Sequence, residues 1–222
     1  DCFEAAGKTF SATHPNAQFI AGPIEALSVE QLMTVTRLKK GELTVLVGGP
    51  PCQAYSVYNH KRGMHDRRAT LFREYLRIVE GMQPEWIVME NVKGIYSIGG
   101  GEAVRSIKSE LAALGYDVEE AVLKAEDFGV PQERRRVVFI GNRLGMPISH
   151  PAPTHGPDRA HPFTTIRDAI GDLPEIENGE DPGVPVYRTE ASSAFQRQLR
   201  GNATHVSQHA APRLGKVNLD RL

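Results

Sequence analysis

The sequence has few cysteines, no long apolar run and no excess of either charge. Two cysteines, Cys2 and Cys52, are too few for a disulfide framework in 222 residues and favour a reducing compartment such as the cytoplasm. No apolar run approaches the roughly 20 residues that span a bilayer, so no membrane-spanning helix is expected. The formal net charge is −1, and any binding of nucleic acid would therefore depend on local basic patches.

The sequence does contain an alternation of amphipathic segments with short apolar runs, in a composition of 40% hydrophobic and 24% charged residues. Such an alternation predicts an α/β fold, with the last two strands pairing as a hairpin-like edge. The predicted helices are Phe3–Thr13, Ser28–Leu38, Thr70–Met82 and Ala103–Leu114, and the predicted strands are Ala17–Ala21, Thr44–Val47, Trp86–Met89, Val118–Lys124 and Val137–Gly141.

The stretch after the strand Thr44–Val47 carries a candidate nucleophile. Gly48-Gly49-Pro50-Pro51 stops the strand, so Cys52 is expected at the mouth of the sheet. Ligands of open α/β sheets bind at the carboxyl ends of the strands, and a thiol at that point can act as a nucleophile. The alternative is a buried, inert cysteine, which the rigid prolines and the polar loop residues after them make less favourable.

A carboxylate and two arginines are expected at the same crevice. Glu90 follows the strand Trp86–Met89, and adjacent parallel strands would bring it close to Cys52. An N-cap is the other interpretation of this position, but glutamate is a poor cap. In the strand that begins near Arg134, alternation sends Arg134 and Arg136 to one face, so their guanidinium groups could converge on the crevice.

Three motifs in this order resemble the cytosine-5 DNA methyltransferases of bacterial type: Pro50-Pro51-Cys52-Gln53, Glu90-Asn91-Val92 and Gln132-Glu133-Arg134-Arg135-Arg136. The resemblance covers roughly Asp1 to Asn142. It implies a doubly wound, mostly parallel Rossmann-like sheet and methyl transfer from S-adenosylmethionine to carbon 5 of a flipped-out cytosine. It also implies that Cys52 adds to carbon 6, Glu90 holds the ring N3 and amine, and Arg136 with Arg134 bonds the ring oxygen and orients Glu90.

The same resemblance implies further binding residues. Asp1 would bond the ribose hydroxyls of the cofactor, and Ile24 would pack on its adenine. Pro23 stands where the family usually has an aspartate for the adenine amino group, which puts that contact in doubt. The remaining cofactor residues implied are Pro51 and Leu71. The residues implied for double-stranded DNA are Gln53, Ser56 and Arg68, as a clamp on the loop after Cys52, together with Gln132. No metal ion is expected.

The resemblance also predicts the division of the chain. Residues 1–149 would form a partial catalytic core, the proline-rich segment 150–163 a linker, and residues 164–222 the start of a target-recognition region. The glycine-rich Phe-x-Gly-x-Gly cofactor loop of the family would precede Asp1, and the closing segments would follow the recognition region. We therefore expect an incomplete catalytic unit and, as a possible partner, a complementary chain segment that supplies the cofactor loop.

Two alternatives stay open. The related enzyme that methylates cytosine in transfer RNA shares the same motifs, although the proline-rich linker and the region after it favour DNA. A non-catalytic regulatory or split-subunit fragment is the other alternative. Cys52, Glu90 and Arg136 together argue against a non-catalytic fragment, whereas the missing cofactor loop argues for it.

Overall fold

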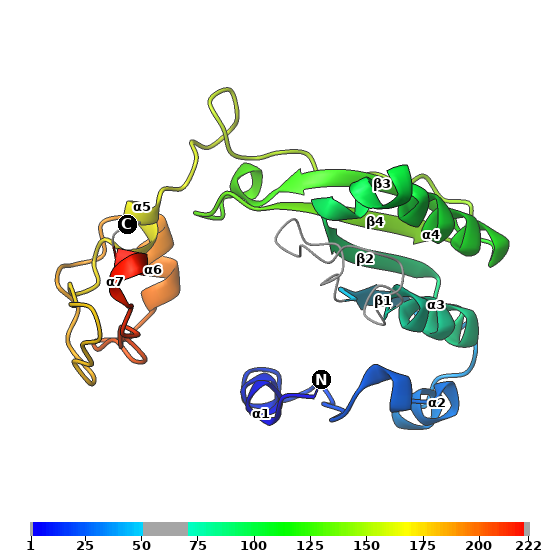
Figure 1. Ribbon diagram of the computed structural model, residues 1–222, viewed down its shortest axis with the longest axis horizontal. Helices are drawn as coiled ribbons and strands as arrows, with labels where there is room; N and C mark the ends of the chain where they lie inside the picture. The colour runs from blue at the N-terminus through cyan, green and yellow to red at the C-terminus, as the bar shows by residue number, and fades with distance from the viewer. Residues whose placement is uncertain (1, 51–70, 220–222) are drawn as a thin grey trace. The chain divides into compact units, whose positions relative to one another are not determined.

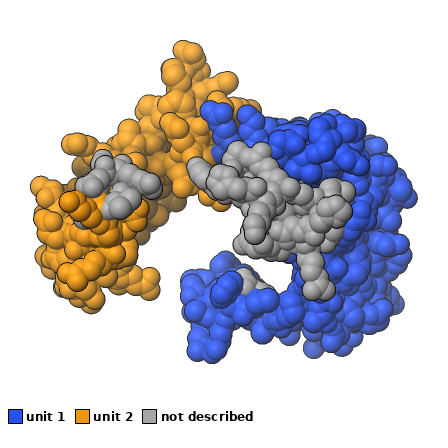
Figure 2. All heavy atoms as spheres, in the orientation of Figure 1, with its two compact units in different colours: residues 1–123, 135–151 blue, residues 124–134, 152–222 orange. Residues whose placement is uncertain are grey.

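The computed structural model describes residues 2–50 and 71–219, and the chain divides into two compact units. The first comprises residues 1–123 and 135–151, and the second comprises residues 124–134 and 152–222 (Figure 2). In the described parts of both units, no helix is both long and apolar enough to cross a bilayer.

The first unit contains a four-stranded mixed sheet with the order β1-β2-β4-β3 (Figure 1). Its strands are β1 (Val45–Gly48), β2 (Trp86–Val92), β3 (Asp117–Lys124) and β4 (Arg135–Asn142). β1 and β2 run parallel, with Gly48 opposite Met89, whereas β2 and β4 run antiparallel, with Met89 opposite Phe139.

The prediction of a mostly parallel sheet was therefore wrong, because the sheet is mostly antiparallel. β3 and β4 are neighbours in the sheet, as the sequence predicted. β4 then inserts between β3 and β2, and it runs opposite to β2. For β4 to run parallel to its neighbour β3, the connection between them would need a crossover of a dozen or more residues. Only residues 125–134 separate the two strands.

The helices of the first unit begin and end close to their predicted bounds. They are α1 (Glu4–Thr13), α2 (Val29–Thr36), α3 (Leu71–Met82) and α4 (Glu102–Ala113), joined by the 3-10 helices η1 (Ile24–Ala26) and η3 (Lys93–Gly100). Ser28 begins α2 with a capping box, in which its side chain accepts a bond from the Gln31 amide at 3.1 Å.

The predicted strand at Ala17–Ala21 is not a strand. A strand needs a neighbour to satisfy its backbone groups, and none of the strands that the structure describes lies beside this segment. Phe19 instead packs on α1: a Cβ atom added to Gly7 would lie 2.5 Å from the ring.

The core lies on one face of the sheet, between the strands and the helices α3 and α4. Alternation along β2 buries Ile87 and Met89 on this face and sends Val88 and Glu90 to the opposite face. Glu90 is therefore kept out of the apolar core by the strand period itself. The core residues are Phe72, Tyr75, Leu76 and Val79 of α3, Ala103, Val104, Ile107 and Leu111 of α4, Ile87 and Met89 of β2, Val137 and Phe139 of β4, and Ile95 and Tyr116.

The second unit is built from short helices and irregular segments: η4 (Ala125–Phe128), α5 (Ile166–Ile170), α6 (Ala194–Arg200) and α7 (Lys216–Leu219). α5 and α6 dock through polar groups, since the buried Gln196 side chain donates to the Arg167 carbonyl at 3.0 Å. The Ser193 hydroxyl donates to the Asp168 carbonyl at 2.5 Å. Arg200 lies over the Tyr187 ring, 4.0 Å from its centroid.

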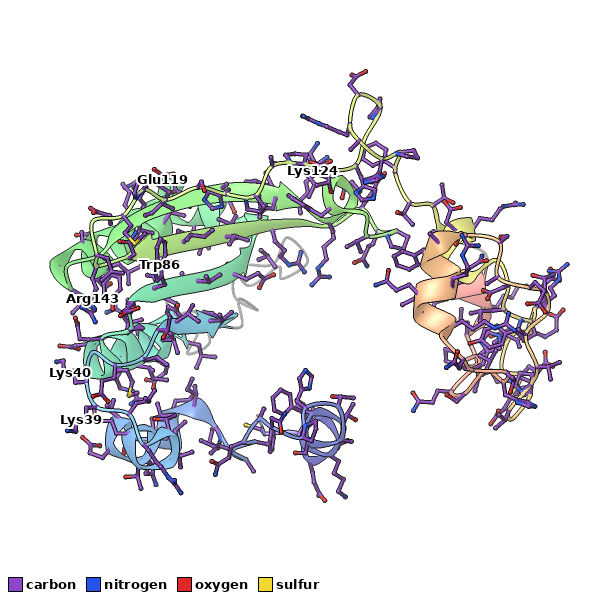
Figure 3. All side chains as sticks on the ribbon, turned by 180° about the vertical axis from the view of Figure 1, so that it is seen from behind. Lys39, Lys40, Trp86, Glu119, Lys124 and Arg143 are labelled. Atoms are coloured by element: carbon purple, nitrogen blue, oxygen red, sulfur yellow. The ribbon has the colours of Figure 1, made fainter. Side chains whose placement is uncertain are left out.

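Arg143 follows β4 at the end of the sheet where Trp86 begins β2 (Figure 3). Its Nε donates to the carbonyls of Gln83 and Pro84 at 3.1 and 3.2 Å, and its Nη2 donates to the Gly41 carbonyl at 2.8 Å. One side chain thus joins the segments that lead into β1 and β2.

Replacing Arg143 with methionine is expected to lower the free energy of unfolding by about 2–3 kcal/mol, because three partly buried carbonyls lose a charged donor. Urea denaturation monitored by circular dichroism measures this change. Arg105→Met is the matched control, since among the described residues the Arg105 side chain donates to a single exposed carbonyl, that of Gly100. An equal loss in the two variants would contradict the role given to Arg143.

Candidate active site and cofactor cavity

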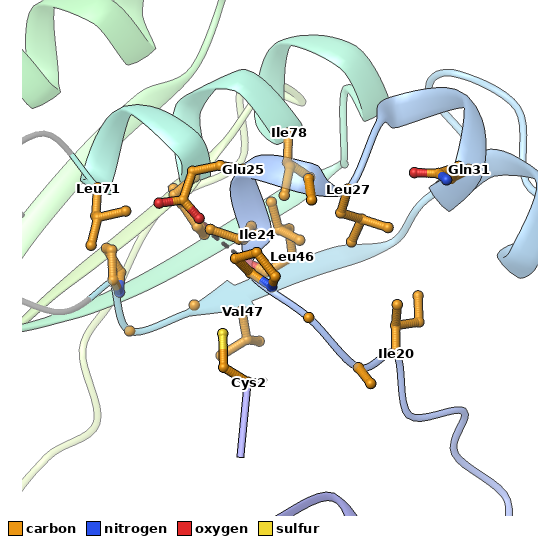
Figure 4. Close-up of a pocket in the computed structure, with 18 residues that line it drawn as sticks. Cys2, Ile20, Ile24, Glu25, Leu27, Gln31, Leu46, Val47, Leu71 and Ile78 are labelled. Atoms are coloured by element: carbon orange, nitrogen blue, oxygen red, sulfur yellow. Dashed lines mark hydrogen bonds between the residues drawn. The ribbon is translucent and has the colours of Figure 1, made fainter. Parts of the chain in front are cut away.

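A cavity of about 950 Å³ lies between the segment 20–27 and the wall formed by β1 and α3 (Figure 4). Ile20, Ile24 and Leu27 line it on the first side, and Leu46, Leu71 and Ile78 line it on the second. Ile24 keeps 41% of its surface exposed, which leaves apolar area for a ligand to cover. Glu25 and Gln31 supply polar groups among these apolar walls. Ligand pockets have this size and this mixture of groups.

Tyr75 of α3 closes the cavity at the point where β1 ends. Its hydroxyl lies 3.1 Å from the carbonyl oxygens of both Leu46 and Val88, and so donates to the paired strands β1 and β2. Burial raises the pKa of Tyr75 well above its usual value, so the hydroxyl remains a proton donor. Its ring covers Gly48, where an added Cβ atom would lie 2.6 Å from ring carbon Cδ2.

Gly48→Ala is expected to lower the free energy of unfolding by about 1–3 kcal/mol, because the added methyl group must displace the buried Tyr75 ring. Thermal denaturation checks this value. Gly215→Ala provides the control, since an added Cβ atom there meets no atom of the described residues within 4 Å. If Gly48→Ala were as stable as the unmodified protein, the close packing of Tyr75 on β1 would be refuted.

Glu90 and Arg136 form an ion pair across β2 and β4. The Arg136 Nε atom lies 2.5 Å from Glu90 Oε1. Glu90 is opposite Val138 in the ladder, so Arg136 is its diagonal neighbour on the same face of the sheet. The side chains are 25% exposed for Arg136 and 45% exposed for Glu90, which leaves the carboxylate accessible while the arginine holds it. β2 extends to Val92, so Glu90 lies within the strand and not after it.

The carboxylate also lies beside Gly49, which precedes Cys52 by three residues in the sequence. A Cβ atom added to Gly49 would lie 3.3 Å from Glu90 Oε2. The predicted parallel pairing of the two strands is confirmed, and it explains this proximity. Cys52 itself lies outside the described residues, as do Asp1, Pro51, Gln53, Ser56 and Arg68.

The other predicted site residues fall into two groups. Ile24 and Leu71 both line the cavity, and their contact with a cofactor stays a prediction. Gln132 and Arg134 are exposed residues of the second unit, and the Arg134 amide donates to Glu126 Oε2 at 3.2 Å. β4 begins one residue after Arg134, and the convergence of Arg134 with Arg136 on the base also stays a prediction.

The sequence did not indicate that Glu25, Gln31 or Tyr75 belongs to a site. Glu25 is a single acid in the otherwise uncharged segment 17–29, which is a weak signal for a polar group in an apolar wall. Leu71, Tyr75 and Ile78 are spaced as one face of a helix, but this spacing cannot show that a cavity borders the face. Within the described parts of the chain, no cluster of three His, Cys, Asp or Glu side chains could hold a metal ion.

The chain matches one family of DNA-modifying enzymes. The family model described as C-5 cytosine-specific DNA methylase matches residues 2–218. The chain belongs to this family.

Curated relatives include the type II methyltransferase M.AgeI of Thalassovita gelatinovora, 33% identical over 96% of this chain and 54% of the relative. M.AquIA of Picosynechococcus is 36% identical over 75% of both chains. A prophage-encoded protein of E. coli, assigned as a DNA modification methyltransferase, shares the fold with a TM-score of 0.69 and 23% identity over 90% of this chain and 56% of that one. The chain spans about half the length of M.AgeI and of several other curated relatives that it matches.

Proposed function

We propose that this chain carries the catalytic residues of an enzyme that transfers a methyl group from S-adenosylmethionine to carbon 5 of cytosine in DNA. The observation that carries this proposal is the Glu90–Arg136 ion pair of β2 and β4. Its carboxylate lies beside Gly49, which follows β1 and precedes Cys52 by three residues. The membership of the chain in the C-5 cytosine-specific DNA methylase family supports it.

In the proposed mechanism the Cys52 thiolate adds to carbon 6 of the cytosine, because carbon 5 is otherwise too weak a nucleophile. The new S–C6 bond pushes electrons toward N3, where Glu90 shares a proton with the ring and bonds its exocyclic amine. Arg136, with Arg134, orients Glu90 and bonds the ring oxygen. Carbon 5 then accepts the methyl group of bound S-adenosylmethionine, which leaves as the neutral thioether S-adenosylhomocysteine. A base then accepts the proton of carbon 5, the electrons of that C–H bond reform the C5–C6 double bond, and the S–C6 bond breaks to release the Cys52 thiolate.

The cavity beside β1 suits the proposed cofactor. Its volume of about 950 Å³ lies in the range of small-molecule pockets, and its apolar walls suit an adenine ring. Ile24, Leu71 and Pro51 would contact the cofactor, and Asp1 would bond its ribose. Bound S-adenosylmethionine supplies an electrophilic methyl group.

The proposed macromolecular substrate is double-stranded DNA that contains a target cytosine. A stacked base cannot reach Glu90 and Cys52, so the base must flip out at a cost of a few kcal/mol. Gln53, Ser56 and Arg68 would clamp the DNA during this step, Gln132 would also contact it, and residues 164–222 would begin the recognition region after the linker 150–163.

A complementary chain segment is the second proposed partner. β1 is an edge strand of the described sheet, and its Val45 and Val47 are 44% and 69% exposed. An open edge with exposed apolar residues favours pairing with a further strand. A segment that carries a glycine-rich loop could bind there and complete the cofactor site.

The test is a methyl-transfer assay with radiolabelled S-adenosylmethionine, offered double-stranded DNA and transfer RNA in parallel. We expect 5-methylcytosine only in the DNA. Methylation of transfer RNA alone would favour the related enzyme. Saturable binding of DNA without any methyl transfer, even with the complementary segment supplied, would favour a non-catalytic fragment.

A further inference from the structure

We infer that Arg77 is a positioning residue for the cofactor: its guanidinium group holds the turn Ile24–Leu27 against α3 and so sets the shape of the cavity. This inference rests on the proposed function, because it assigns S-adenosylmethionine to that cavity. Arg77 does not line the cavity itself. Its effect would pass through the backbone of the turn.

The contacts of Arg77 connect two segments that are distant in the sequence. Its Nη2 donates to the carbonyl oxygen of Ile24 at 3.0 Å and to that of Leu27 at 2.9 Å. Its Nε donates to Glu74 Oε2 at 2.9 Å, which holds the guanidinium plane on the surface of α3. A guanidinium can make all these bonds at once because its donors point outward in one plane.

The two carbonyls belong to the first residue of the 3-10 helix η1, Ile24, and to its C-cap, Leu27. The Leu27 amide donates to the Ile24 carbonyl at 3.2 Å, and the Arg77 bond is added to this one. Between the two bonded carbonyls stand Glu25 and Ala26, and Glu25 is an acidic residue of the cavity wall. Fixing both carbonyls therefore fixes where the Ile24 and Glu25 side chains enter the cavity.

A second contact on the same face of α3 limits how the turn can move. Gly81 is four residues after Arg77 and so lies above it on the helix. A Cβ atom added to Gly81 would lie 2.4 Å from the Val29 side chain, at the first residue of α2. The turn and the start of α2 are thus docked on α3 at two points one helical turn apart. Arg77 is the polar point and the closer one to the cavity.

The test combines cofactor binding with hydrogen exchange in Arg77→Met. We expect the dissociation constant of S-adenosylmethionine, measured by calorimetry, to rise about tenfold, because a loosened turn populates the binding-competent shape less often. Without cofactor, the amides of Ala26 and Leu27 should exchange faster. Arg77→Lys keeps the charge and some of the hydrogen bonds, so its dissociation constant should lie between those of the unmodified protein and Arg77→Met.

Arg105→Met is the control, because Arg105 also donates to a carbonyl, but this carbonyl belongs to Gly100, which does not line the cavity, whereas Ile24 and Leu27 do. Its affinity and its exchange at residues 26 and 27 should match those of the unmodified protein. Unchanged affinity in Arg77→Met, or an equal loss in Arg105→Met, would overturn the inference while leaving the proposed function intact. Absence of cofactor binding by the unmodified protein would overturn the cofactor assignment and, with it, the inference.

Discussion

Replacing Glu90 with glutamine is expected to slow methyl transfer by roughly 10²- to 10⁴-fold, the usual contribution of a positioned acid or base. The amide keeps the size of the side chain but cannot share a proton with the ring N3 of cytosine. It also loses the 2.5 Å ion pair with Arg136. Single-turnover kinetics with preformed enzyme–DNA complex measures this step directly, without product release.

Glu119→Gln is the matched control for Glu90→Gln. Glu119 is an exposed glutamate of β3 (Figure 3), and β4 lies between its strand and β2, which carries Glu90. Its variant should retain the rate of the unmodified enzyme. The double variant Glu90→Gln with Arg136→Gln should lose less rate than the two single losses combined, because one of the two proposed roles of Arg136, the orientation of Glu90, is already lost in Glu90→Gln. Full additivity of the two losses would show that Arg136 does not act through Glu90.

Cys52→Ala is expected to abolish turnover while leaving DNA binding largely intact. Without the thiolate no bond to carbon 6 can form, and the ring remains too poor in electrons to accept a methyl group. Methylation is measured by incorporation of label, and DNA binding by gel shift at one stated salt concentration. Equal methylation by the variant would refute the assigned nucleophile.

DNA containing 5-fluorocytosine tests the same residue from the side of the substrate. Fluorine at carbon 5 leaves no proton to lose, so elimination of the sulfur is blocked and a covalent protein–DNA adduct should accumulate. The adduct should survive denaturing electrophoresis and be missing in Cys52→Ala. An active enzyme that forms no adduct would contradict the covalent mechanism.

Local signals in the sequence were sufficient to predict where the helices of the first unit lie and which residues of the four observed strands are apolar. Ser28 followed by Gln31 begins α2, and apolar residues at helical spacing define α3 and α4. The prediction of a strand at Ala17–Ala21 was wrong. Phe19 of this segment packs on α1, and no strand of the described sheet lies beside the segment to pair with it. The local sequence pattern cannot distinguish a strand that pairs in a sheet from an apolar segment that packs on a helix.

The relative direction of β2 and β4 could not be predicted from such local signals. Val137 and Phe139 indicate a buried strand, but the alternation that buries them is the same in parallel and antiparallel pairing. The insertion of β4 beside β2 depends on how its buried face packs against Ile87 and Met89. That packing joins residues about fifty positions apart and leaves no local signal.

The sequence by itself determined which chemical groups the protein has and, through strand alternation, that Glu90 points away from the core side chains Ile87 and Met89. Only the tertiary structure decided their partners: Arg136 meets Glu90 because β4 docks antiparallel beside β2, and Arg77 meets carbonyls 53 and 50 residues away because α2 docks on α3. The physical reason is that hydrogen bonds and ion pairs act over a few ångströms. Which distant groups come that close is set by the packing of whole elements.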